Sequence, residues 1–526
     1  MSNVRAMRSA EQIHRRIENE DHLMQPRGDP TTEGTGPDLL VLLEMSGQGT
    51  LRRRLRDALH DAIRSGRLPP GSRLPSSRAL AADLGVSRGV AVDAYAQLSA
   101  EGFLVSRPGS GTVVADTGGQ VLEHTASVQG PAVSGQAPQE IDLRPGPPDL
   151  STFPRTTWAK AIRDVLRTVS DADLGYMPPW GVDTLCERLT EYLGRVRGVR
   201  TNPSLVVVAT GATQGITLLA RVLHGAGVVD IAVEAPSNPV QRQVLGRYGV
   251  RVWDVQIDDE GLVVDVLAQT PCRAVIVTPG HQYPCGMVMS ASRRGALMRW
   301  ADRVDGLVIE DDYDAVFRHD KMQVGALQML SPARVALVGS VSKSLAPGLR
   351  LGWVVSPPGL VGDLRMAKRD DDFGTGVLEQ YALARLMETG EYDRHVRRLR
   401  RHYRKRRDTI VHALRRELPD VVIEGYAAGL HLLVRLPPDV GEERFIAAAE
   451  AQGVALLGTL RMYGTLPPQP CVVIGYGRTS STMLEEAARR LGAALATVRQ
   501  TTPPTRPARD GQAATQRRPS TAVDYF

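Results

Sequence analysis

The chain has 526 residues, of which 42% are hydrophobic and 23% are charged, and its formal net charge is +6. This length exceeds what one hydrophobic core organises, so we expect more than one folding unit. The sequence holds no run of about 18 apolar residues and no apolar signal core, which argues against a membrane protein and predicts a cytoplasmic location without a membrane partner.

Three segments lack the apolar residues that a packed core needs. They are residues 1–37, residues 116–140 and residues 501–526, which are rich in polar residues, Gly or Pro. Because such segments cannot offset the entropy of ordering, we expect a disordered N-terminal extension, a flexible linker and a disordered tail. Two folded units remain, covering residues 38–115 and 141–500.

The first unit has the pattern of a winged helix-turn-helix. Apolar residues recur at helical spacing over 51–62, Ser76 caps a short helix, and Ser87 caps a second helix that carries apolar residues on one face. Two short apolar runs, 103–107 and 112–114, flank a Pro-Gly-Ser-Gly turn and predict a two-stranded wing.

This unit is also basic, with ten Arg against six Asp or Glu in residues 40–115. In a winged helix the second helix of the pair enters the major groove, and its first turn must be polar. Phosphate contacts and a wing of small residues complete such a surface. The candidate DNA-binding residues are Arg78, Ser87, Arg88, Gly89, Arg107 and Gly111.

The stretch from Gly66 to Val114 closely resembles the winged helix of the GntR family of bacterial transcription regulators. The resemblance implies that Arg78, Ser87, Arg88 and Gly111 contact a double-stranded DNA operator. Many members carry a polar residue or arginine late in the recognition helix, where this chain has Val92 and Asp93. We expect Asp93 to repel phosphate.

The second unit alternates apolar strands with longer helical stretches. The expected strands are residues 205–209, 231–234, 274–277, 307–310, 335–339 and 351–355. Such alternation implies crossover connections, and therefore an α/β fold with a largely parallel sheet and helices on both faces. Residues from about 390 onward are expected to form a smaller α+β lobe.

Lys343 is the central candidate of the second unit. It follows an apolar strand and lies near Ser340, Ser342 and Arg350. An amine nucleophile, hydroxyl donors and a fixed countercharge are what a Schiff base with pyridoxal 5'-phosphate requires. A small-residue turn at 210–214, including Ala212 and Thr213, opens a helix and can bind the phosphate through backbone amides.

Two further motifs would meet this lysine at the carboxyl ends of parallel strands. Asp311 can keep the pyridine nitrogen protonated and Tyr313 can reach the phenolic oxygen, although acidic clusters in loops are more often solvated. His281 edges the ring, either as a general acid or base or as a structural hydrogen-bonding residue. The four cysteines lack metal-ligand spacing, so we expect reduced thiols and no metal site.

Residues 141–500 resemble a fold-type I aminotransferase domain, and their combination with the winged helix, over roughly residues 40–500, is similar to the MocR subfamily of GntR regulators. The motifs that carry this resemblance are LRPGPPDLSTFP, GATQG, TPGHQYPCG, IEDDYD, SVSKSLAPGLRLGW and AAGLH. It implies that Lys343 binds the cofactor covalently, that Asp311 pairs with the pyridinium and Tyr313 with the phenolic oxygen, and that Ser340, Ser342 and Arg350 hold the phosphate. It also implies a homodimer. Asn238 stands where members commonly have a ring-stacking tyrosine.

Residues 394–407 contain nine Arg or Lys in fourteen positions. They predict either a solvated helix that pairs with acids of the larger lobe, which we favour, or an auxiliary surface for DNA or another anion. Arg478 is a candidate partner for the carboxylate of an amino-acid effector.

Together these observations favour a transcription regulator that senses pyridoxal phosphate or an amino compound. Control of cofactor synthesis and control of amino-compound metabolism both stay open. The alternative is an active aminotransferase with a tethered DNA-binding unit, and a third hypothesis is a DNA-binding protein without cofactor. Enzyme activity is thus uncertain, and we expect weak transamination at most.

Overall fold

The computed structural model describes residues 49–107, 111–116, 141–318, 324–425, 428–462 and 469–501. The chain divides into two compact units, one containing the first two of these ranges and the other the remaining four. The predicted extension 1–37, residues 117–140 of the predicted linker and residues 502–526 of the predicted tail lie outside the described residues.

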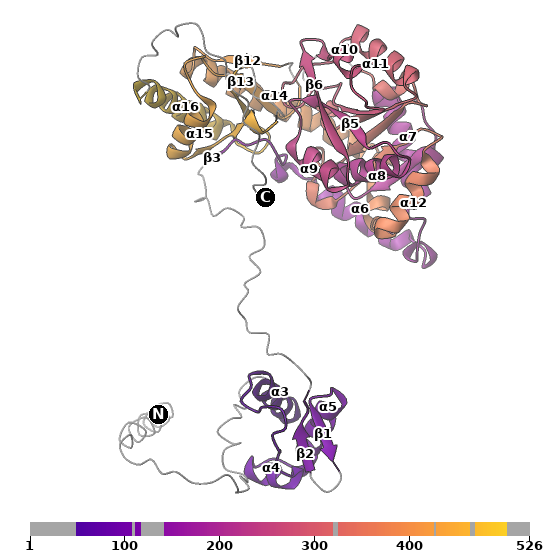
Figure 1. The fold of residues 1–526 in the computed structure, drawn as a ribbon, viewed down its shortest axis with the longest axis vertical. Coiled ribbons are helices and arrows are strands. Elements are labelled where there is room, and N and C mark those ends of the chain that lie inside the picture. The colour runs from indigo at the N-terminus through magenta and orange to yellow at the C-terminus, as the bar shows by residue number, and fades with distance from the viewer. Residues whose placement is uncertain are drawn as a thin grey trace. The chain divides into compact units, whose positions relative to one another are not determined.

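The first unit is a winged helix-turn-helix, as the apolar spacing predicted (Figure 1). It consists of α3 (Leu51–Arg64), α4 (Ser77–Asp83), α5 (Arg88–Ala100), β1 (Leu104–Arg107) and β2 (Gly111–Val114). The three helices and the wing enclose one core that includes Leu55, Leu59, Leu80 and Leu98.

Of the two predicted helix caps in this unit, one forms its hydrogen bond and the other does not. Ser76 accepts a hydrogen bond from the amide of Ala79 at the start of α4. Ser87 occupies the N-cap position of α5, but its side chain forms no capping hydrogen bond, so the hydroxyl stays exposed. The hydroxyl of Tyr95 donates to the carbonyl of Pro75 at 2.9 Å and ties α5 to the segment before α4.

The second unit has an eight-stranded sheet in the order β4-β11-β10-β9-β8-β5-β6-β7. Strands β10, β9, β8, β5 and β6 run parallel, whereas β11 is antiparallel to both β10 and β4. Two strands, β6 and β7, were missed by the sequence analysis. The bounds are β4 (Val206–Ala209), β5 (Asp230–Ala235), β6 (Arg251–Asp258), β7 (Gly261–Leu262), β8 (Ala274–Val277), β9 (Leu307–Asp312), β10 (Val335–Ser340) and β11 (Gly352–Val355).

Helices cover both faces of this sheet, as expected for buried parallel strands. Alternate strand residues point to opposite faces: Val207 packs with α8, α9 and α12, while Val206 and Val208 pack with α6, α7 and α13. Helices α10 and α11 cover the part of the second face that β8, β5 and β6 form. The bounds are α6 (Arg155–Thr168), α7 (Asp183–Arg197), α8 (Ala212–Gly225), α9 (Pro239–Arg247), α10 (Val264–Leu267), α11 (Ala291–Arg303), α12 (Val361–Asp372) and α13 (Val377–Glu388).

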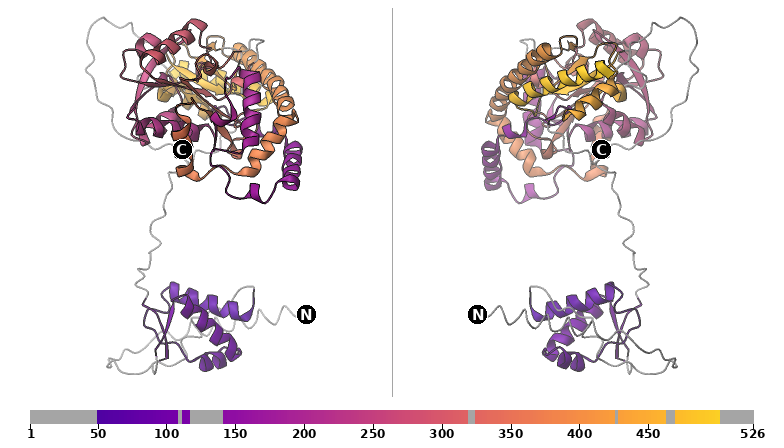
Figure 2. Two further views of the ribbon diagram at one scale, coloured as in Figure 1. Left: turned by 90° about the vertical axis from the view of Figure 1, so that its right-hand side faces the viewer. Right: turned by 90° about the vertical axis from the view of Figure 1, so that its left-hand side faces the viewer.

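The long helix α14 (Glu391–Glu417) joins this layer to a smaller lobe. Its first turns pack with α13 through Tyr392 and Val396, and its later turns enter the core of the small lobe, where α14 and α16 lie side by side (Figure 2). The remaining elements of that lobe are β3 (Ile141–Asp142), β12 (Val422–Glu424), β13 (His431–Arg435), α15 (Glu442–Ala451), β14 (Val454–Ala455), β15 (Leu457–Gly458), β16 (Cys471–Gly475) and α16 (Ser481–Thr501). Among the helices in the described ranges, none combines the length and apolarity that crossing a membrane requires.

Candidate functional site

The carboxyl ends of the parallel strands meet around a cavity of 420 Å³. Loops after β4, β5, β8, β9 and β10 reach it, together with segments of the small lobe. Eight of the nine residues predicted to bind the cofactor line its wall: Ala212, Thr213, Asp311, Tyr313, Ser340, Ser342, Lys343 and Arg350. The ninth, His281, lies directly behind Tyr313.

Lys343 follows β10 and points its amine into the cavity. Its Nζ donates a 2.7 Å hydrogen bond to the carbonyl of Gly146. Burial lowers the pKa of Lys343, while the nearby carboxylates of Asp314 and Asp311 oppose that shift. A lysine whose ammonium form is disfavoured releases its proton more readily, which is what nucleophilic attack by the amine requires.

Asp311 lies at the end of β9 and is buried. Burial raises the pKa of its carboxyl to about 7, and the amide of Gln241, which donates to Oδ2, partly opposes that shift. The other oxygen, Oδ1, is buried and has no hydrogen-bond partner in the described part of the chain. A buried acceptor of this kind is costly unless a donor is supplied by something else.

Tyr313, His281 and Asp314 form a connected polar group at the edge of the cavity. The Nδ1 of His281 lies 3.0 Å from both the hydroxyl of Tyr313 and Oδ2 of Asp314. Because an ionised carboxylate only accepts, this contact favours the tautomer with the proton on Nδ1. His281 is thus a hydrogen-bonding residue that orients Tyr313, which is one of the two roles that the sequence left open.

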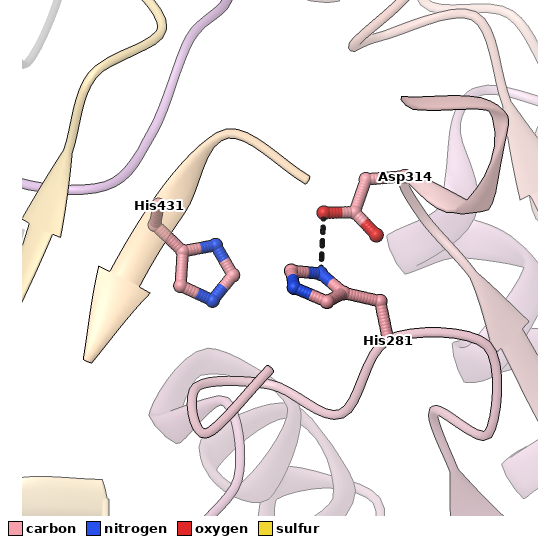
Figure 3. A group of neighbouring side chains, drawn as sticks. All are labelled: His281, Asp314 and His431. Atoms are coloured by element: carbon pink, nitrogen blue, oxygen red, sulfur yellow. Dashed lines mark hydrogen bonds and ion pairs between the residues drawn. The ribbon is translucent and has the colours of Figure 1, made fainter. Parts of the chain in front are cut away.

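His431, at the start of β13, lies opposite this group (Figure 3). Burial lowers the pKa of His431 to about 3, with the neighbouring His281 acting in the same direction, so its imidazole is neutral. His281, Asp314 and His431 each bring a ligand atom within 4.8 Å of the other two. Two imidazoles and a carboxylate suit a transition metal, a possibility that the sequence did not predict.

Gly429 makes room for this group. It has φ +71°, and a Cβ at this position would overlap both the imidazole of His281 and the carboxylate of Asp314. Glycine is therefore required twice, for the backbone angle and for the space.

The phosphate end of the cavity is formed by two loops that touch each other. Arg350 adopts φ +51°, a left-handed conformation that is uncommon outside glycine, and its Nη2 donates a 2.6 Å hydrogen bond to the carbonyl of Thr210. The amide of Ser342 donates to Oγ of Ser340 at 3.4 Å. Helix α8 begins at Ala212, so its first amides face the cavity near this guanidinium.

The acidic residues at the end of β9, Glu310 to Asp312, are not solvated. Glu310 and Asp312 both contact the buried Arg197, with an Arg197 Nε to Asp312 Oδ2 distance of 3.0 Å. Each carboxylate of the run therefore has its own buried environment, which excludes the solvated-loop alternative.

Sequence analysis missed several residues of the cavity wall. Glu234 is buried, and its Oε2 accepts hydrogen bonds from the amide and the hydroxyl of Thr278. Burial raises its pKa to about 7. Gln241 and His431 also line the wall. Gln241 lies on α9, where no local pattern distinguishes it from a packing residue. His431 is the last residue of the AAGLH motif, to which the sequence analysis assigned no role in the site.

Two other predicted positions have local structural roles. Asn238 lines the cavity, and its side chain accepts a 3.0 Å hydrogen bond from the amide of Val240 as the N-cap of α9. Arg478 is not among the residues that line the cavity; it pairs with Asp142 and donates to the carbonyl of Arg144. The four cysteines are buried and form no disulfide, as expected.

The winged helix carries five predicted DNA-binding residues whose exposure the structure describes. Arg78, Ser87, Arg88, Gly89 and Gly111 are all exposed. The strand β1 ends at Arg107, but the side chain of Arg107 lies outside the described residues, as does the turn 108–110. Asp93 forms an ion pair with Arg52, which reduces the repulsion of phosphate that the sequence suggested.

Arg73 is a further exposed residue of the winged helix, which the sequence analysis did not name. It is exposed, and a Cβ at Gly111 would lie 3.6 Å from its Nε. The guanidinium therefore lies beside the wing, where small residues leave the backbone accessible. The residue was not singled out because the segment 68–75 has no recognisable periodicity.

Comparisons with known proteins agree with this architecture. The family model for bacterial regulatory proteins of the gntR family matches residues 51–114, and the model for aminotransferase class I and II matches residues 139–491. A GntR helix-turn-helix domain implies binding to DNA.

Full-length relatives combine the same two parts. The chain is 31% identical to the probable rhizopine catabolism regulatory protein MocR of Rhizobium meliloti, over 87% of this chain and 96% of that protein. It is also 31% identical to the pyridoxine biosynthesis transcriptional regulator PdxR of Corynebacterium glutamicum, over 84% of this chain and 95% of that protein.

Among solved structures, kynurenine aminotransferase of Pyrococcus horikoshii superposes with a TM-score of 0.63 at 26% identity. The superposition covers 68% of this chain and 91% of that enzyme. The second unit therefore has the fold of an aminotransferase.

Proposed function

This chain belongs to the MocR subfamily of GntR transcription regulators, and from that premise we propose that its aminotransferase-like unit binds pyridoxal 5'-phosphate as a sensor. The winged helix would recognise an operator, and the second unit would report on the cofactor itself or on an amino compound that reacts with it. An aldehyde held next to a lysine condenses reversibly with amines, which is the chemistry that the cofactor supplies.

The residues of the cavity fit this cofactor. Lys343 offers an amine with a lowered pKa, and Asp311 offers a buried oxygen without a partner. A pyridinium N–H would provide the donor that this carboxylate lacks, and the positive charge would favour its ionised form. The pairing of these two unusual groups in one cavity is the observation on which the proposal rests.

The other wall residues would hold the phosphate and the ring. Arg350, Ser340, Ser342 and the amides of Ala212 and Thr213 supply donors at one end of the cavity, as a phosphate dianion requires. At the ring edge, Tyr313 would donate to the phenolic oxygen, with His281 and Asp314 fixing its orientation.

Two assays test the proposal directly. Incubation of the purified protein with pyridoxal phosphate should give the absorbance of a lysine Schiff base, and borohydride should then label Lys343. A footprint on the DNA upstream of its own reading frame, with and without the cofactor, tests whether loading changes operator binding. A colourless protein that borohydride does not label would refute the sensor.

A homodimer is part of this proposal. Large apolar side chains are exposed on the second unit: Tyr176 is fully exposed, Phe373 is 68% exposed and Leu174 is 51% exposed. Exposed apolar groups of this kind are common at protein interfaces. A dimer would carry two winged helices, and the operator should then contain paired half-sites.

The second candidate is an active aminotransferase tethered to a DNA-binding unit. It is favoured by the complete set of Lys343, Asp311 and Tyr313 in one cavity and by the aminotransferase fold. Multiple turnovers with a panel of amino donors, at rates near the typical ~10 per second, would establish it. If an amino donor reacts once with the bound cofactor and no further turnover follows, the result supports the sensor proposal.

A further inference from the structure

The first half of α14 carries a row of arginines on its exposed side. Five of them are exposed, and each lies three or four residues from at least one other: Arg394, Arg397, Arg398, Arg401 and Arg404. Residues at this spacing share one side of a helix. Together with Arg318 and Arg400, they line a hollow of 610 Å³, and every lining residue that the structure describes is an arginine.

Three of these seven guanidinium groups have partners within the protein. Arg394 donates to Glu391 and to the carbonyl of Thr389, Arg400 donates to the carbonyl of Val316, and Arg318 donates to the carbonyl of Gly280.

The other four have neither a hydrogen bond nor an ion pair with any residue that the structure describes. We call them the arginine face: Arg397, Arg398, Arg401 and Arg404. The favoured expectation that this stretch pairs with acids of the larger lobe is therefore wrong for these four side chains.

The arrangement has an energetic cost in the free protein. Like charges three or four residues apart on a helix destabilise it by roughly 0.2–0.5 kcal/mol per pair. The helix persists because its opposite side is packed, with Leu399 and Tyr403 buried in the small lobe. An anion that occupied the hollow would relieve the repulsion.

The chemistry of the hollow specifies the anion. Guanidinium groups present planar forks of donors that match phosphate oxygens, and several forks around one hollow suit a chain of phosphates better than a single carboxylate. DNA is the polyanion that this protein already engages through its winged helix. Once the first unit is bound, the covalent chain keeps the second unit at a high effective concentration near the same duplex.

We infer that the arginine face of α14 binds the phosphate backbone of DNA next to the operator. This is a second contact, independent of sequence and cofactor, which adds to the affinity of the winged helix. It positions the aminotransferase-like unit on the duplex without reading bases.

The test uses the full chain and a matched pair of double variants. Arg397→Gln with Arg401→Gln removes two charges from the arginine face. Arg299→Gln with Arg303→Gln removes two exposed charges at the same i, i+4 spacing from α11, and these residues have no ion pair in the described chain. Glutamine keeps the helix propensity of arginine, so both variants should fold.

Binding is measured by fluorescence anisotropy as a function of salt, on the operator alone and on the operator with long flanking duplex. On the flanked probe, the loss of two phosphate contacts should make the slope of log K against log salt less steep by about 1.8 and weaken binding roughly 30-fold at 0.15 M salt. The control variant should match the wild-type protein on both probes. Cofactor absorbance should be unchanged in both variants, which separates this inference from the sensor proposal.

Three results would overturn the inference. The first is an unchanged slope and affinity of the α14 variant on the flanked probe. The second is an equal loss in the control variant, which would indicate a general charge effect. The third is a change in oligomeric mass with unchanged DNA affinity, which would identify the arginine face as a contact between proteins.

Discussion

Replacing Asp311 by asparagine should stabilise the cofactor-free protein and weaken the binding of the cofactor. Burial raises the pKa of this carboxyl from 3.8 to about 7 in the empty cavity. At about 1.4 kcal/mol per unit, this shift corresponds to roughly 4 kcal/mol. The folded state keeps the proton between pH 4 and 7 while the unfolded state has released it, so stability falls as pH rises through this window and is lowest above pH 7.

Asparagine removes this penalty because it cannot ionise. In the cofactor-free protein, Asp311→Asn should therefore be more stable than the wild-type chain at pH 8, by at most about 4 kcal/mol, and the advantage should shrink towards pH 4. Each kcal/mol moves the Tm of a large domain by roughly 2 °C, so the difference is measurable by differential scanning fluorimetry.

With cofactor this stability advantage should shrink. The variant loses a charge-assisted hydrogen bond to the pyridinium, which is worth about 1.5–3 kcal/mol, or roughly a 10- to 150-fold weaker Kd. Asp312→Asn is the control, because it removes one of the two ion-pair partners of the buried Arg197 and should destabilise both forms, by up to about 3–5 kcal/mol. A cofactor-free Asp311→Asn protein that melts below the wild type at pH 8 would refute the reasoning.

Four further predictions follow from individual contacts. Lys343→Ala should abolish both the Schiff-base absorbance and any effect of the cofactor on the footprint; retention of either would contradict the covalent role. Arg88→Ala should weaken operator binding by about 1–3 kcal/mol in anisotropy titrations and leave cofactor binding intact. Gly429→Ala should lower stability by at least about 1–3 kcal/mol, since the new Cβ meets His281 and the backbone angle disfavours alanine. An unchanged Tm would show that His281 and Asp314 move to make room for the methyl group. Tyr95→Phe should cost about 1 kcal/mol in urea unfolding because it leaves the carbonyl of Pro75 without its donor.

Much of the fold could be read from short-range patterns. Helical spacing predicted α3, and the cap at Ser76 predicted the start of α4, because capping and amphipathicity depend only on neighbouring residues. Continuous apolar runs predicted six strands of the sheet within two residues of their observed ends. The strand β6 was missed because its residues alternate in burial and include several charges.

The sequence predicted those cavity residues that lie in a recognisable motif. Asp311 lies at the end of the buried strand β9, and Lys343 lies in the loop after β10, which also leads to Arg350; parallel strands bring such ends to one edge. Glu234, Gln241 and His431 were not predictable, since their proximity to Lys343 results from packing between elements that are distant in sequence.

The sequence by itself determined which elements form, which family the motifs resemble and which residue types supply an amine, an acid and a phosphate clamp. Local propensity and apolar periodicity depend on neighbours within a few residues, and a chain carries that information in its order alone. Only the tertiary structure decided which charged groups have an ion-pair or hydrogen-bond partner. It assigned Arg197 to Glu310 and Asp312 of β9 and Arg478 to Asp142, and it left the arginine face of α14 without a partner among the residues that the structure describes. Pairing depends on distance in space, and residues that are equally basic in the sequence become structural or available according to what the fold places beside them.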